Sequence, residues 1–128
     1  MRPSKAHALA ALSLLFSGCA ATPPPQTSAV AASPAATIVT LAAPDGRSVD
    51  LTVTAPAKPR GVILFSHGAG SSPAATPRLF QRLVAKGFAV VAPTHTDSLT
   101  IPADRRSTLQ AALATRVADM KVAAAHAD

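Results

Sequence analysis

Two stretches early in the sequence alternate apolar and polar side chains, which is the pattern of half-buried β-strands. They cover residues 37–42 and 48–55, and Pro44-Asp45-Gly46 between them has the composition of a tight turn. Because a short turn joins strands that run in opposite directions, this pattern predicts an antiparallel hairpin.

A nearly continuous apolar stretch over residues 61–66 follows, as expected for a parallel strand that is covered on both faces. Thr76 and Pro77 suit the start of a helix, and Gly87 suits its end. A second apolar strand is predicted over residues 88–93. The order strand, helix, strand predicts a βαβ unit. The apolar face of its helix would consist of Leu79, Phe80, Leu83 and Val84.

A long helix is predicted after a polar loop over residues 94–106. Ser107 is expected to cap it, and the helix should run toward His126. Arg116 and Asp119 lie three residues apart, so we expect them to pair on the helix surface. The apolar residues at helical spacing predict a buried stripe made of Leu109, Leu113, Val117, Met120 and Ala124.

Residues 1–18 have the organisation of a bacterial lipoprotein signal peptide. Arg2 and Lys5 precede an apolar segment that is too short to cross a bilayer, which takes about 20 residues. Small residues then lead to Cys19, which is the only cysteine, so a disulfide within the chain is excluded. We predict cleavage before Cys19 and lipid on its sulfur; an ordinary signal peptide is the alternative.

Residues 19–36 are rich in Pro, Ala and Ser. Such a segment cannot bury enough apolar surface to offset the entropy lost on ordering, and its prolines keep it extended. We therefore expect a tether that holds one small folded domain, residues 37–128, away from a membrane of the cell envelope, facing the periplasm or the exterior.

The charge pattern argues against nucleic acid as a partner. The chain has 12 Lys and Arg against 6 Asp and Glu, but the basic residues are scattered and there is no Tyr or Trp to stack on bases. Solvated surface charge is the simpler interpretation.

The sequence Ser66-His67-Gly68-Ala69-Gly70 closes the strand of residues 61–66. An apolar strand that ends in such a turn aims backbone amides at a developing negative charge. This arrangement resembles the oxyanion-hole strand of the α/β-hydrolase superfamily, especially its esterase and dienelactone-hydrolase-like branch. The resemblance implies that the Ala69 main-chain N–H donates to the oxyanion, that His67 orients the turn, and that Gly68 and Gly70 allow close approach of substrate.

The resemblance covers the whole of residues 37–128 and implies the N-terminal part of an α/β-hydrolase fold. Its hairpin, βαβ unit and long helix would leave the sheet incomplete. Residues 90–93, followed by His95 and Asp97, resemble the family's fourth strand and the loop after it. The strand of residues 61–66 would then be an apolar sheet edge without charge, bulge or proline, and such edges promote aggregation.

The nucleophile of the family is missing, because the sequence contains no Gly-x-Ser-x-Gly. Ser66 is next to His67, but neighbours on a strand point to opposite faces and cannot share a proton. Ser71 and Ser72 are better explained as turn residues. His95 is expected to bond to Asp97 or to the backbone.

A metal site is an alternative at the carboxyl ends of the two adjacent parallel strands, where His67, His95 and Asp97 would meet. Three nitrogen and oxygen ligands are enough for zinc, but no metal-ligand spacing supports it and the turn already accounts for His67. We predict no metal and no cofactor.

Two classes of function stay open. The first is the N-terminal portion of a lipid-anchored serine hydrolase for small carboxylic esters or lactones, inactive alone and in need of a complementing C-terminal half. The second is a non-catalytic, lipid-anchored module for binding or assembly.

Overall fold

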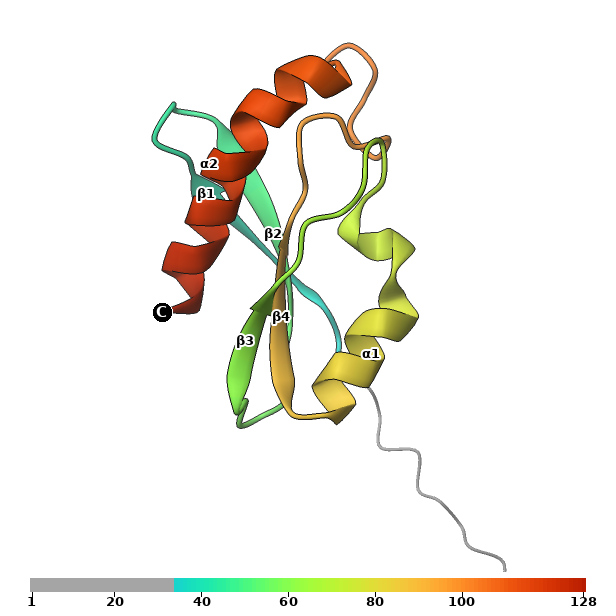
Figure 1. The fold of residues 1–128 in the computed structure, drawn as a ribbon, viewed down its shortest axis with the longest axis vertical. Coiled ribbons are helices and arrows are strands. Elements are labelled where there is room, and N and C mark those ends of the chain that lie inside the picture. The colour runs from blue at the N-terminus through green and yellow to red at the C-terminus, as the bar shows by residue number, and fades with distance from the viewer. Residues whose placement is uncertain (1–33) are drawn as a thin grey trace, which may run out of the picture. The chain divides into compact units, whose positions relative to one another are not determined.

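The computed structural model describes residues 34–128. The predicted signal peptide, Cys19 and nearly all of the predicted tether lie outside the described residues. The described part contains β1 (Thr37–Ala42), β2 (Ser48–Thr54), β3 (Gly61–Leu64), a single 3-10 turn η1 (Pro73–Ala75), α1 (Pro77–Ala85), β4 (Phe88–Pro93) and α2 (Leu109–Ala127). Its strands form one mixed sheet in the order β1-β2-β4-β3 (Figure 1).

The predicted hairpin is confirmed, with β1 and β2 paired antiparallel from Thr37 opposite Val53 to Ala42 opposite Ser48. Gly46 takes the left-handed conformation in the turn, with a φ of 81°. Glycine adopts this region without the steric cost that a Cβ would impose. The turn therefore places Arg47 in a fixed position at the end of the hairpin.

The predicted βαβ unit is also confirmed, with β3 and β4 parallel and α1 between them in the chain. Thr76 precedes α1 as expected, but its hydroxyl donates to the Pro73 carbonyl at 3.3 Å and does not cap the helix. Gly87, with a φ of 86°, ends the helix turn that leads into β4. The β3 strand ends two residues earlier than expected, although the Phe65 N–H still bonds to the Val91 carbonyl at 2.9 Å.

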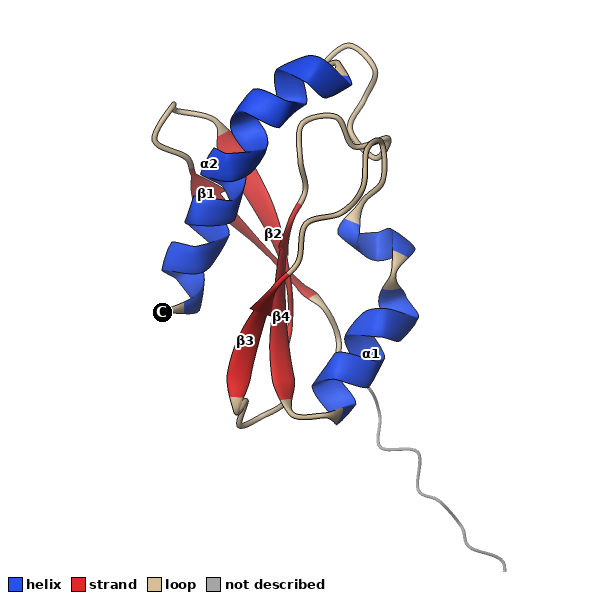
Figure 2. Cartoon of the chain, viewed as in Figure 1, coloured by secondary structure: helices blue, strands red, loops and turns tan. Residues whose placement is uncertain are grey.

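The two α-helices cover opposite faces of the sheet (Figure 2). Successive residues of a strand point to opposite faces, and β4 serves both. Val91 packs in a core cluster with Val122 and Ala123 of α2, whereas Val90 packs with Phe80 of α1. Neither helix of residues 34–128 has the length and apolar character needed to cross a membrane.

The stripe predicted to bury α2 against the sheet is wrong. Leu113 and Val117 are 58% and 63% exposed. The buried residues of this helix are instead Ala112, Asp119, Val122 and Ala123. Small side chains let the helix lie close to the sheet, so the larger apolar residues face away from it. The N-cap is Thr108, one residue later than expected, and its hydroxyl accepts from the Ala111 N–H.

The β3 strand lies at the edge of the sheet, as its predicted place in the fold requires, and pairs only with β4 within residues 34–128. Val62 and Leu64 are 42% and 39% exposed. An apolar edge strand of this kind offers the free backbone groups of its unpaired side to other chains.

We expect the purified chain to aggregate through this edge and Val62→Lys to keep more of it monomeric. A charge on an edge strand opposes pairing with another copy. Size-exclusion chromatography of both proteins measures the effect. Ile38→Lys, on the opposite edge strand β1, is the matched control and should not improve solubility. A wild-type monomer with sharp cooperative unfolding would contradict the expectation.

Candidate functional site

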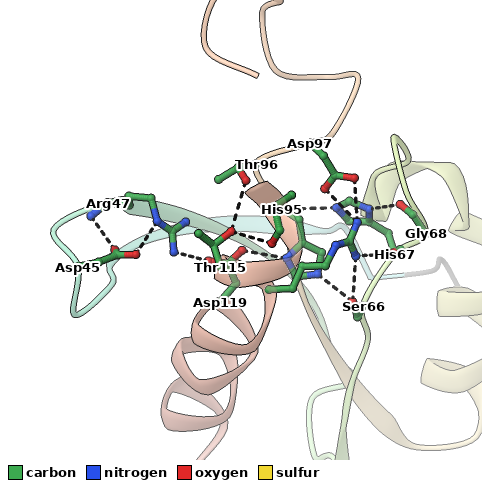
Figure 3. A network of polar contacts seen from close by, with 12 residues as sticks. Asp45, Arg47, Ser66, His67, Gly68, His95, Thr96, Asp97, Thr115 and Asp119 are labelled. Atoms are coloured by element: carbon green, nitrogen blue, oxygen red, sulfur yellow. Dashed lines mark hydrogen bonds and ion pairs between the residues drawn. The ribbon is translucent and has the colours of Figure 1, made fainter. Parts of the chain in front are cut away.

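Polar side chains gather at the carboxyl ends of β3 and β4, which lie at the same end of the sheet (Figure 3). Parallel strands present their carboxyl ends together, and open α/β sheets bind ligands there. The loop after β3 contributes Ser66 and His67, the loop after β4 contributes His95 and Asp97, and α2 supplies further groups. Residues far apart in the chain thus form one hydrogen-bonded network.

His67 joins the two loops and is 3% exposed. Its Nε2 accepts from the His95 backbone N–H at 3.0 Å, so its proton must lie on Nδ1, which donates to the Gly68 carbonyl at 2.8 Å. Burial lowers the pKa of His67 and favours this neutral form. These contacts are what a turn-orienting histidine requires, and that role stays a prediction.

The turn after His67 leaves two amides, those of Gly68 and Ala69, without a partner within residues 34–128. Gly70, with a φ of 66°, donates its N–H to Asp97 Oδ2 at 3.0 Å, and the Ser71 N–H donates to the Gly68 carbonyl at 3.1 Å. The N–H of Ala69 makes no hydrogen bond with any group of residues 34–128. Ala69 is exposed. A Cβ on Gly68 would meet nothing within 4 Å, and the close approach of substrate at this glycine stays a prediction.

Arg116 ties the two loops to α2. Its Nη2 lies 2.9 Å and 3.0 Å from the two carboxylate oxygens of Asp97, and its Nη1 donates to the His67 carbonyl at 2.7 Å. Burial alone would raise the pKa of Asp97, but the Gly70 N–H and the guanidinium outweigh it, and the net pKa is lowered. The predicted surface pair between Arg116 and Asp119 is therefore wrong.

Asp119 is fully buried and bonds to two other elements. Its Oδ1 accepts from Arg47 Nη2 at 2.9 Å, and its Oδ2 lies 2.9 Å from His95 Nδ1. Arg47 also reaches Asp45 of the same turn, with Nε 2.7 Å from Oδ2. The buried carboxylate thus has a cationic partner and a hydrogen bond on each oxygen, the condition under which such a charge is tolerated.

His95 was expected to bond to Asp97 or to the backbone, but its ring bonds elsewhere. An ionised carboxylate only accepts hydrogen bonds, so His95 Nδ1–H donates to Asp119 and Nε2 is left as an acceptor. Ser66 Oγ lies 2.8 Å from that Nε2 and donates its proton to it. Ser66 is exposed whereas His95 and Asp119 are fully buried.

Adjacency in the sequence pointed only to His67 as a base for Ser66, and His95 was expected to make other contacts, yet His95 bonds to Ser66 from 29 positions away. Spacing along the chain also gave no sign of the contact between Arg47 and Asp119. One signal was present for Asp119: it shares a helix face with Ala112, Val122 and Ala123, and an acid among buried positions needs a partner.

The three residues weighed as metal ligands are already engaged. Asp97 bonds to Arg116 and Gly70, and His67 Nε2 accepts from His95. Among residues 34–128, no group of three or more His, Cys, Asp and Glu side chains is placed to hold a metal ion.

No protein-family model and no curated protein matches the sequence. Among solved structures, brefeldin A esterase, a bacterial homologue of human hormone-sensitive lipase, superposes with a TM-score of 0.54 at 19% identity, over 72% of this chain and 26% of that one. The esterase Est22 superposes with a TM-score of 0.55 at 21% identity, over 73% of this chain and 30% of that one. This chain therefore spans less than a third of either esterase.

At these identities the likeness shows the fold alone. Both structures are named as esterases, and each superposes on more than two thirds of this chain. The fold predicted from the sequence, part of an α/β-hydrolase fold with an incomplete sheet, is confirmed.

We expect Asp97→Asn to destabilise the domain by about 1.5–3 kcal/mol, the usual worth of hydrogen bonds to a charged group. Urea unfolding of chains that also carry Val62→Lys would measure the change. Asp50→Asn is the control, because Asp50 is exposed and its only side-chain partner within residues 34–128 is Thr40.

The comparison between Asp97 and Asp97→Asn also predicts a pH dependence of stability. Because the folded pKa of Asp97 is lowered, its stabilisation is fully present above the unfolded pKa of about 3.9. It is lost as the pH falls through the folded pKa, so the two proteins should converge in stability in acid. A difference that stays constant down to low pH would contradict this account.

Proposed function

We propose that residues 37–128 are the N-terminal portion of a serine hydrolase of the esterase and dienelactone-hydrolase-like branch, acting on small carboxylic esters or lactones. The observation that carries the proposal is the Ala69 N–H. Ala69 is exposed and its N–H is unpaired within residues 34–128, as is that of Gly68, whereas the Gly70 and Ser71 amides that follow are both bonded.

The chemistry needs such a donor. When a serine attacks an ester carbonyl, the carbonyl oxygen becomes negatively charged, and preorganised N–H groups stabilise it. Ala69 would supply one of the two donors. The second donor and the nucleophile would come from a strand-to-helix turn carried by a complementing C-terminal half.

Two surfaces support a missing half. The β3 edge has exposed Val62 and Leu64, and α2 carries exposed Leu109, Leu113 and Val117. Further strands beside β3 would pair with the free edge and bury apolar surface that now faces water. The two esterases are more than three times as long as the region that they share with this chain.

Ala69→Pro tests the role of the amide, because proline removes the N–H. In the protein completed with its C-terminal half, we expect kcat for p-nitrophenyl acetate to fall by about 100–1000-fold, the usual loss for one oxyanion donor. KM should change little, because the donor acts mainly in the transition state.

Ala69→Gly keeps the N–H and is the matched control for this substitution. Equal melting temperatures of the two variants would show that the turn still folds. Full activity of Ala69→Pro would overturn the assignment. If the completed protein has no hydrolase activity at all, the non-catalytic binding or assembly module becomes the better account.

We also propose that the domain is anchored to a membrane of the cell envelope by lipid on Cys19. The basic start, short apolar segment and small residues before Cys19 support it. Cells grown with labelled palmitate should transfer the label to the wild-type chain and to Ser28→Ala, but not to Cys19→Ala. Export of an unlabelled wild-type chain would indicate an ordinary signal peptide.

A further inference from the structure

The polar network at the carboxyl ends of β3 and β4 contains a hydroxyl, an imidazole and a carboxylate in series. Ser66 Oγ lies 2.8 Å from His95 Nε2, and His95 Nδ1 lies 2.9 Å from Asp119 Oδ2. This is the order of bonds in a serine nucleophile, its general base and the acid that orients the base. These three residues do not form the triad implied by the family resemblance, because that nucleophile follows a later strand and its acid precedes its histidine in the chain.

The protonation states suit a nucleophile. Arg47 binds the oxygen of Asp119 that does not face His95, so the buried carboxylate has a cationic partner on that side. That carboxylate fixes the proton of His95 on Nδ1 and leaves Nε2 free to accept the Ser66 proton. His95 is fully buried, whereas Ser66 is an exposed residue.

A cation also lies beside the hydroxyl. Arg116 Nη1 is 3.4 Å from Ser66 Oγ and 2.7 Å from the carbonyl of the next residue, His67. A guanidinium there can stabilise negative charge that develops next to the serine oxygen.

We propose that Ser66 is a nucleophile in its own right, acylated by small esters with an acidic leaving group, with His95 as its base and Asp119 as the positioning residue. Ser66 Oγ bonds to the ester carbonyl carbon while His95 Nε2 takes its proton. The bond to the leaving group then breaks, and the leaving oxygen takes the proton from His95. The product is a Ser66 ester, which water hydrolyses with His95 again as the base.

The probe is a fluorophosphonate added to the full chain alone, with the adduct located by mass spectrometry. We expect one phosphonyl adduct, on Ser66, that is absent from Ser66→Ala and absent when the wild-type chain is unfolded in urea. Ser71→Ala, which removes a neighbouring hydroxyl, should label at the wild-type rate.

Asp119→Asn tests the positioning residue, and we expect labelling at least about 100-fold slower, because His95 then loses the carboxylate that keeps its proton on Nδ1. A native circular dichroism spectrum with an unchanged rate would overturn the role of Asp119. If that variant does not fold, the comparison of native and urea-unfolded wild-type chains decides.

No adduct on Ser66 in the native chain, or equal labelling of Ser66 and Ser71, would overturn the proposal. The Ser66 hydroxyl would then serve only to satisfy the buried His95 nitrogen. This outcome would leave the oxyanion role of Ala69 untouched, because that role is tested in the completed protein by a different substitution.

Discussion

The buried charge of Asp119 is the constraint on which the arrangement of this domain depends. A carboxylate without solvent must be paired and hydrogen-bonded, or the fold loses several kcal/mol. Its two oxygens are satisfied by Arg47 from the β1–β2 turn and by His95 from the loop after β4. Neither partner belongs to α2, so this helix has one position on the sheet in which its own acid is stable.

Arg116 and Asp119 lie close together on α2 and bind two different parts of the fold. Asp119 draws on the hairpin turn, while Arg116 binds Asp97 and the carbonyl of His67. The loops after β3 and β4 have no regular hydrogen-bond ladder of their own, so these side chains fix them. The turn that presents the Ala69 amide is therefore placed by a helix that lies distant in the sequence.

The sequence was sufficient for elements set by local chemistry. Alternation, Gly46 and Gly87 were enough to predict the hairpin and the βαβ unit, because turns and burial patterns are written in neighbouring residues. The face of α2 was predicted wrongly, because Leu113 and Val117 are apolar but the sheet accepts small residues. The predicted pair between Arg116 and Asp119 was also wrong, because each residue binds partners from other parts of the fold. Spacing along the helix carries no information about such partners.

The contact between Arg47 and Asp119 joins residues that are 72 positions apart. A chain that is synthesised from its N-terminus contains the hairpin turn long before α2 is made. Until then Arg47 and His95 lack their common partner, Asp119. Non-local contacts of this kind require closure of a long loop and slow the folding reaction. The ordered site is thus a late product of folding, formed only after α2 docks, and it is absent from any nascent chain still lacking that helix.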